Sequence, residues 1–307
     1  MNASSAMPPP FVRKRVATRA NRRQTRQPAR ESRAFLSRAV RFLAGEAGIG
    51  QFLDVGTGLP TADNTHQVAQ RVNPQSRGVY VDNDPMVLAH ARALLVGSPE
   101  GLTRYVHADL RDPQAVLREA ADHLDLDQPV AVLLFGVLGH VGDDDEAVAV
   151  IRALLDAVPS GSYLALSDGT DTSEAVVESH RQYNESGALP YHLRSPERIA
   201  RFFDGLDLVE PGLVPFTHWR PEQDGPPADL DDYCAGPQAL IARRNDRAGG
   251  RTSVGPTVPL VAPRGAVRFS YGEVGPGTRR LPTAARAAGG ADGGRPARRD
   301  RQVLPGR

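Results

Sequence analysis

The sequence predicts an α/β fold: a mostly parallel, Rossmann-like sheet with helices on both faces. Short apolar segments alternate with amphipathic ones along residues 31–243, at the spacing of repeated strand–helix–strand units. Residues 129–135 form an almost unbroken apolar run, which is typical of a central parallel strand covered on both faces. The first predicted strand ends in a glycine-containing turn, the position at which open α/β sheets bind ligands.

The predicted elements follow a regular order. The first helix is expected over residues 31–47, where apolar side chains recur at helical spacing until Gly48. Asp84 and Pro85 have the N-cap and first-turn chemistry that begins another helix. Further helices are expected at residues 62–72, 85–95, 113–123, 145–158, 172–186 and 196–203, and strands at residues 51–55, 78–81, 103–107, 129–135, 162–167, 205–209 and 238–243. Residues 213–219 are expected to extend the strand at 205–209 or to pair with it, which places an antiparallel pair at one edge.

Composition divides the chain into three parts. Residues 1–30 are basic and without periodicity, and residues 244–307 are rich in Arg, Gly and Pro, so both are predicted to be disordered. Residues 31–243 form the predicted domain. The single cysteine, Cys234, excludes an intrachain disulfide and favours the reducing cytoplasm. We find neither a secretory signal nor an apolar run long enough to span a membrane.

The net charge of +1 conceals a strong asymmetry along the chain. Of the 37 basic and 36 acidic residues, nine basic and one acidic lie in residues 1–33, and fourteen basic and four acidic lie in residues 243–307. That leaves 14 basic and 31 acidic residues for positions 34–242. Because phosphate binding requires a basic face, this acidic centre argues against nucleic acid as the partner of the domain.

The turn after the first strand, Gly56-Thr57-Gly58, is the first of three candidate site features. Gly56 permits a tight turn, and Gly58 lets a ligand approach the backbone closely. Thr61 stands where a dinucleotide-binding loop has its third glycine, which disfavours a pyrophosphate. Asp54 would also repel a pyrophosphate, whereas it suits the positively charged amino group of S-adenosylmethionine. A tight turn without a ligand remains the alternative.

The other two features follow the second and third strands. Asp82 can accept hydrogen bonds from both hydroxyls of a ribose, with Asn83 adding a contact. Asp109, between Ala108 and Leu110, can accept from the exocyclic amine of an adenine. Capping or loop-start acids are the alternatives for both. Together with the glycine turn, the two acids predict a three-point site for an adenosyl cofactor without phosphate.

Longer segments carry a family resemblance. They are 54–61 (DVGTGLPT), 64–70 (NTHQVAQ), 79–85 (VYVDNDP), 88–92 (LAHAR), 202–206 (FFDGL), 209–213 (VEPGL) and 219–221 (WRP). They resemble the actinobacterial S-adenosylmethionine-dependent methyltransferase family that was once catalogued as a domain of unknown function. The resemblance covers roughly residues 31–233. It does not extend to residues 1–30 or to the segment after Tyr233.

The resemblance implies a class I methyltransferase fold, a seven-stranded sheet with an antiparallel last pair. It assigns Asp54, Gly56 and Gly58 to the methionine end of the cofactor, Asp82 to the ribose and Asp109 to the adenine. The full set of residues expected to bind S-adenosylmethionine is Asp54, Gly56, Thr57, Gly58, Asn64, Asp82, Asn83, Ala108, Asp109, Leu110, Phe135 and Gly136.

Methyl transfer is an in-line displacement in which the protein mainly positions the reactants. His140, after the fourth strand, is the candidate base, since imidazole titrates near neutral pH; a packed or capping histidine is the alternative. Tyr183 and His192 are candidate contacts of a small-molecule acceptor, because they lie in the polar segment 168–194. No metal-ligand motif is present, and the acidic run 143–145 is expected to be charge at a helix N-terminus.

Two other functions compete with a methyltransferase. One is a protein that binds S-adenosylmethionine without turnover, which the atypical ends of the chain favour. The other is a nicotinamide-dependent oxidoreductase, against which the missing third glycine and Asp109 both count. The sequence identifies neither the acceptor, nor the methylated atom, nor the oligomeric state.

Overall fold

The computed structural model describes residues 19–60, 63–94, 97–221 and 238–245. The helices are α1 (Arg19–Gly45), α2 (Thr65–Val72), α3 (Pro85–Leu94), α4 (Pro113–Ala121), α5 (Asp144–Asp156), α6 (Glu174–Glu185) and α7 (Pro196–Ala200), with 3-10 turns η1 (Leu138–His140), η2 (Arg201–Phe203) and η3 (Phe216–His218). The strands are β1 (Gln51–Val55), β2 (Arg77–Asp82), β3 (Leu102–His107), β4 (Ala131–Phe135), β5 (Tyr163–Asp168), β6 (Asp207–Leu208), β7 (Val214–Pro215) and β8 (Gln238–Arg243). The predicted disorder of residues 1–18 and 246–307 lies outside the described residues.

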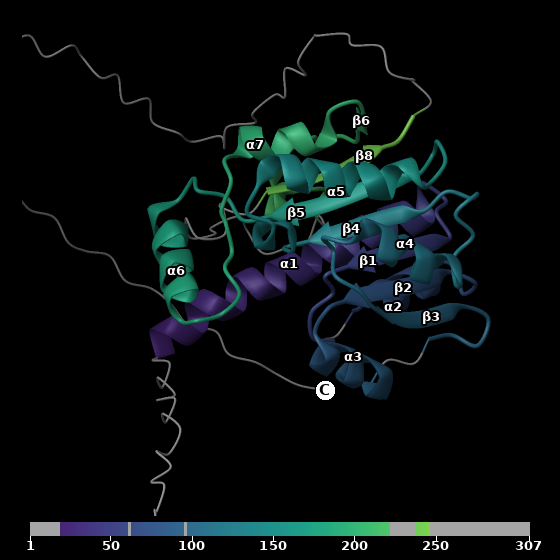
Figure 1. Ribbon diagram of the computed structural model, residues 1–307, viewed down its shortest axis with the longest axis horizontal. Coiled ribbons are helices and arrows are strands. Elements are labelled where there is room, and N and C mark those ends of the chain that lie inside the picture. Colours follow the sequence, from purple (N-terminus) through teal and green to yellow (C-terminus); the bar gives the residue numbers. More distant parts are fainter. Residues whose placement is uncertain (1–18, 61–62, 95–96, 222–237, 246–307) are drawn as a thin grey trace, which may run out of the picture. The chain divides into compact units, whose positions relative to one another are not determined.

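One sheet organises the described chain (Figure 1). Its strand order is β3-β2-β1-β4-β5-β8-β6, and the short β7 pairs with β8 off this path. Strands β1 to β5 pair in parallel, whereas β8 runs antiparallel to both β5 and β6. The predicted α/β class, with a mostly parallel sheet and antiparallel pairing at one end, is confirmed. Parallel pairing brings the carboxyl ends of β1 to β4 to the same edge of the sheet.

Two apolar layers hold helices against the sheet. On one face, α4 and α5 bury residues such as Val116 and Ile151 against Leu53 of β1. On the other face, α1 and α2 bury Phe35 and Val68 with other apolar side chains. Figure 1 shows the long purple α1 crossing behind the strands. A strand covered on both sides, such as β4, therefore has an apolar sequence throughout.

Helix α1 is longer than predicted. It begins at Arg19, twelve positions before the expected start at residue 31, and so extends into the segment predicted as disordered. The segment lacks apolar periodicity, which is why pattern reasoning does not detect a helix there. From Phe35 onward the helix agrees with the prediction, since one side of it is buried in the core.

The segment after β6 differs from the prediction. Residues 213–219 neither extend β6 nor pair with it; instead both β6 and β7 pair with β8, with Leu208 opposite Ala242 and Val214 opposite Ala239. The chain turns at Gly212, which has a φ of +83°. Pro215 then lacks the N–H that a longer strand would need, and the chain continues as the 3-10 turn η3.

Helix starts follow the expected capping chemistry. The Asp143 carboxylate caps α5 by accepting from the Glu146 N–H at 2.8 Å. Asp84 accepts from the Met86 N–H at 2.8 Å at the start of α3. The acidic run before α5 is therefore helix N-terminal charge, as predicted, although Asp144 has a further role described below. No helix in the described ranges is long and apolar enough to cross a membrane.

Candidate functional site

A cavity opens where β1, β2, β3 and β4 end. Its volume is about 360 Å³, which is within the range of small-molecule sites. Ten of the twelve residues expected to bind the cofactor line it: Gly56, Thr57, Gly58, Asp82, Asn83, Ala108, Asp109, Leu110, Phe135 and Gly136. His140 lines it as well. The structure thus brings together residues that are up to 84 positions apart in the sequence.

The glycine turn after β1 forms the floor of the cavity. Gly56 has a φ of +74° and Gly58 a φ of +62°, both in the left-handed region that favours glycine. A Cβ on Gly56 would lie 2.2 Å from a methyl carbon of Val137. The turn is tied to the neighbouring strand by the Gly56 N–H, which donates to the Val81 carbonyl at 2.8 Å. Glycine at position 56 is therefore required both by the backbone and by the close packing.

Asp82 is held in place by two backbone donors. Its Oδ2 accepts from the Gly58 N–H at 2.9 Å, and its Oδ1 accepts from the Asp84 N–H at 2.9 Å. The carboxylate therefore joins the end of β2 to the glycine turn after β1. Each oxygen keeps a second lone pair. Asp82 thus suits the two neighbouring hydroxyls of a ribose.

Asp109 and Asn83 are joined across the ends of β3 and β2. Asn83 Nδ2 donates to Asp109 Oδ2 at 3.2 Å, and Arg111 donates to Asp109 Oδ1 from its backbone N–H at 2.9 Å. Burial raises the pKa of Asp109, but these hydrogen bonds and the Arg111 charge together lower it by more. Its pKa therefore lies below the usual value. The side chain is therefore an ionised acceptor at neutral pH, as recognition of an amine requires.

His140 ends the 3-10 turn η1 after β4. Its Nδ1 lies 2.9 Å from the Pro190 carbonyl oxygen, which is an acceptor only, so Nδ1 carries the hydrogen. In neutral imidazole the lone pair is then on Nε2. The ring packs edge-on against Tyr191, with centroids 5.1 Å apart. This arrangement fixes both the tautomer and the plane of a potential base.

The segment 190–194 makes hydrogen bonds to η1 and so holds His140 in place. The sequence did not predict this role. The His192 N–H donates to the Gly139 carbonyl at 2.7 Å, and Tyr191 Oη donates to Asp168. Arg194, which is fully buried, donates to the Leu138 and Val141 carbonyls at either side of His140. A buried arginine has no periodic or motif signal that would identify it in a sequence.

The carboxylate of Asp168 lies at the centre of this support. It is buried at the end of β5, and Arg194 Nη1 approaches its Oδ2 to 3.5 Å. Burial raises the pKa of Asp168 to about 6, while the Tyr191 hydroxyl and the Arg194 charge lower it. Burial also raises the pKa of the Tyr191 hydroxyl well above its usual value, and the neighbouring carboxylate adds to the rise. Tyr191 therefore stays protonated and acts as a donor.

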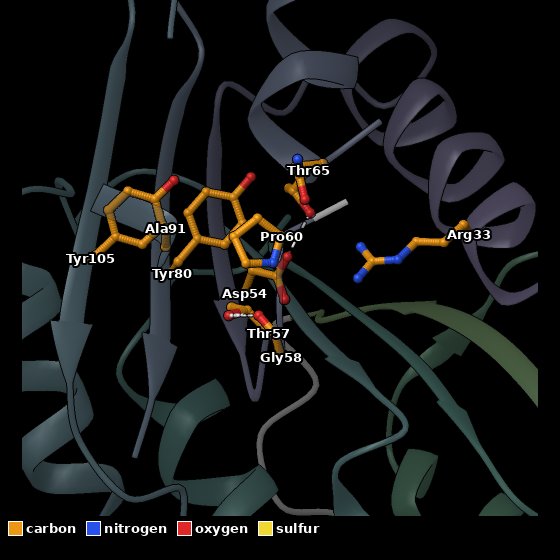
Figure 2. Close-up of a pocket in the computed structure, with 10 residues that line it drawn as sticks. Arg33, Asp54, Thr57, Gly58, Pro60, Thr65, Tyr80, Ala91 and Tyr105 are labelled. Carbon is orange, nitrogen blue, oxygen red and sulfur yellow. Dashed lines mark hydrogen bonds between the residues drawn. The ribbon is translucent and has the colours of Figure 1, made fainter. Parts of the chain in front are cut away.

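Asp54 and Asn64 do not line the large cavity. They lie on the other side of the glycine turn, in a smaller, narrow pocket of about 10 Å³ that Thr57 and Gly58 share with the large one (Figure 2). Asp54 accepts from the Thr65 hydroxyl at 2.6 Å. Asn64 is the N-cap of α2, and its N–H donates to Gln67 at 2.9 Å. Asp54 takes this position because side chains alternate between the two faces along β1, and Asn64 takes it because it begins α2.

The two candidate acceptor contacts lie outside the cavity lining. Tyr183 is on α6 and 42% exposed. His192 is engaged through its backbone with Gly139, beneath η1. Leu189, which lies between them in the sequence and was not among the predicted residues, lines the cavity instead. Within the described ranges, no group of His, Cys, Asp and Glu side chains is placed to hold a metal ion.

Several known proteins are similar to this chain. A family model described as S-adenosyl methyltransferase matches residues 12–245. The crystal structure of a DUF574 family protein from Streptomyces avermitilis is similar to this chain, with 42% identity over 74% of this chain and 91% of that one and a TM-score of 0.65. A proposed methyltransferase from Thermobifida fusca has 41% identity over 74% and 89% of the two chains and a TM-score of 0.66. Among curated proteins, no match is found.

Proposed function

The chain belongs to the S-adenosyl methyltransferase family, and we propose that it transfers the methyl group to a small-molecule acceptor in the cavity at the ends of β1 to β4. It is an S-adenosylmethionine-dependent methyltransferase whose acceptor is unidentified. The observation that carries the proposal is the convergence of the glycine turn, Asp82, Asp109 and His140 on one cavity.

The residues present fit an adenosyl group. The left-handed turn at Gly56 and Gly58 leaves its backbone open to the cavity, and Asp82 and Asp109 are two preset acceptors at its side. We assign Asp82 to the ribose and Asp109 to the adenine amine. When bound, S-adenosylmethionine supplies a methyl group activated by a sulfonium centre. The protein's part is to orient the reactants, to exclude water and to accept the proton that the acceptor loses.

His140 has the geometry of the base. Its Nε2 could accept the proton that an acceptor X–H loses when its X atom is methylated. The resulting imidazolium remains hydrogen-bonded through Nδ1 to the Pro190 carbonyl. Val141 and Leu189 line the cavity beside it as apolar walls. These walls favour an acceptor of modest size with an apolar body.

We further propose that the enzyme acts in the cytoplasm of an actinobacterium. The single cysteine is consistent with a reducing compartment. The organisms of the two similar structures support the bacterial group. An acidic central region supports a small-molecule acceptor over nucleic acid.

Calorimetry on the full chain tests the cofactor site. We expect S-adenosylhomocysteine to bind the wild type, and Asp82→Ala to weaken that binding by about 1–3 kcal/mol, the loss of hydrogen bonds to a charged group. Asp84→Ala is the matched control, because Asp84 caps α3 and does not line the cavity. Equal affinities of wild type and Asp82→Ala would refute the ribose assignment, and tighter binding of NAD would contradict the proposed function.

Affinity for the cofactor should also depend on pH through Asp54. Burial raises its pKa to about 6; Thr65 and Arg33 lower it, and Asp82 raises it. Only the ionised carboxylate attracts the ammonium at the methionine end. Affinity for S-adenosylhomocysteine should therefore rise roughly tenfold from pH 5 to pH 7 and level off above, as linkage to one proton requires.

Asp54→Asn provides the comparison for this pH dependence. Its affinity should be lower at pH 7 and nearly constant over the same range. Tyr80 and Tyr105 also face Asp54, but burial raises the pKa of both hydroxyls above 10, so neither titrates in this interval. A pH dependence that persists in Asp54→Asn would assign it to another group.

A further inference from the structure

The smaller pocket beside the glycine turn contains two opposite charges. Its lining comprises Asp54 of β1 and Arg33 of α1, together with Gly58, Asn64 and Thr65 around them. Asp54 is 6% exposed, whereas Arg33 is half-buried at the pocket wall. Its walls carry one anion and one cation, a charge pattern that is complementary to a zwitterion. The methionine end of the cofactor carries an ammonium and a carboxylate on the same carbon.

Arg33 approaches this pocket from outside the adenosyl-binding segments. Figure 2 shows its side chain extending from α1 toward the Asp54 carboxylate and the turn at Thr57 and Gly58. Its Nη2 donates to the Leu59 carbonyl at 3.4 Å, a long and weak hydrogen bond. The guanidinium is thus held at the turn while the rest of its planar fork remains available to a carboxylate.

The two cavities meet at the glycine turn. Thr57 and Gly58 line both of them. The Gly58 N–H that holds Asp82 belongs to this turn, so a ribose at Asp82 lies beside the turn that borders the smaller pocket. A planar guanidinium is the side chain best suited to pair with a carboxylate through two hydrogen bonds.

We propose that Arg33 binds the carboxylate at the methionine end of S-adenosylmethionine, opposite Asp54, which takes the ammonium. The proposal rests on the proposed function, since it assumes that the adenosyl group occupies the large cavity. It adds α1 to the cofactor site. The first helix, packed on the sheet through Phe35 and Leu36, then holds the end of the cofactor as well as the core.

A structural role for Arg33 is the competing explanation. Its positive charge lowers the pKa of Asp54, so it could act as a counter-ion alone. The two roles differ in their dependence on the ligand. A counter-ion affects every ligand that meets Asp54, whereas a carboxylate receptor affects only ligands that carry a carboxylate.

Calorimetry with two probes at pH 7 separates these roles. The probes are S-adenosylhomocysteine and its decarboxylated analogue, which keeps the ammonium. We expect Arg33→Ala to weaken binding of S-adenosylhomocysteine roughly 10- to 100-fold, as for a charge-assisted pair, and to change binding of the analogue less than threefold. Arg33→Lys keeps the charge but not the fork and should lose an intermediate amount. Arg41→Ala, on the same helix and bonded to Ser37, is the control and should bind both probes normally.

Each outcome decides the proposal. An equal loss of affinity for both probes would overturn it in favour of the counter-ion role, and no loss for either would exclude Arg33 from the site. Retained binding of the analogue by Arg33→Ala shows that the variant is folded. If the wild type binds neither probe, it is the proposed function that fails, and this result is distinct from the other two.

Discussion

Arg194→Met should lower the free energy of unfolding by about 3–5 kcal/mol, because it leaves a buried carboxylate and two carbonyls without their partner. The Arg194 guanidinium donates to Asp144 Oδ1 at 2.7 Å and to the Leu138 carbonyl at 2.9 Å, and it also faces Asp168. Methionine fills a similar volume without supplying any donor. Urea denaturation measures the loss directly.

Arg198→Met is the matched control for this experiment. Arg198 also pairs with Asp144, at 2.6 Å, but its side chain is 45% exposed. Exposed pairs contribute about 0–1 kcal/mol, so the control should unfold almost as the wild type does. Equal losses for the two variants would show that burial of Arg194 is not what makes it important.

The effect of Arg194→Met should itself depend on pH. Without the guanidinium, the pKa of Asp168 rises further above the value it has in the unfolded chain. The folded variant then binds a proton more tightly than the unfolded one, so its stability falls as pH rises. The deficit relative to wild type should be smaller at pH 5 than at pH 8. A deficit that is larger at pH 5 would contradict this account of Asp168.

His140→Ala should reduce kcat by about 10²- to 10⁴-fold on an acceptor that is protonated at neutral pH, the usual contribution of a general base. Its affinity for S-adenosylhomocysteine should remain close to that of the wild type, because the assigned adenosyl contacts are made by other residues. The assay follows transfer of a labelled methyl group from S-adenosylmethionine to components of a small-molecule extract. The labelled product identifies the acceptor, which then serves as the substrate in the kinetic measurements.

His180→Ala controls for lost ring packing. His180 packs against Tyr191 with centroids 5.2 Å apart, nearly as His140 does, but it does not line the cavity. We expect a normal kcat for this variant. Loss of activity in both variants would indicate that support of Tyr191 is what matters, and full activity in His140→Ala would exclude His140 as the base. Cofactor binding without transfer by the wild type would favour a binding protein without turnover.

Much of the fold could be predicted because its signals are local. The apolar run of β4, the Asp84 cap and the alternation of strands and helices depend on residues close together in the sequence. The prediction was incomplete where an element depends on residues that are far away in the sequence. Helix α1 begins earlier than its apolar pattern, and β7 pairs with β8 because of a partner 25 residues downstream rather than its own composition.

The convergence of the residues assigned to the cofactor was predictable for a topological reason. Parallel pairing places every strand end at one edge, so Gly56, Asp82 and Asp109 meet once they are known to follow β1, β2 and β3. The residues on the acceptor side of the cavity were less predictable. Tyr183 and His192 of segment 168–194 were the predicted acceptor contacts, but of these three residues only Leu189 lines the cavity.

The sequence by itself determined the order of the strands and helices, the turn at Gly56 and the acids that follow β2 and β3, because each depends on neighbouring residues. Only the tertiary structure decided which nitrogen of His140 carries the hydrogen, where Arg194 is buried and that Arg33 and Asp54 line one pocket. These features are contacts between elements separated by 20 to 60 residues. No local pattern encodes them, since they arise when the helices pack on the completed sheet.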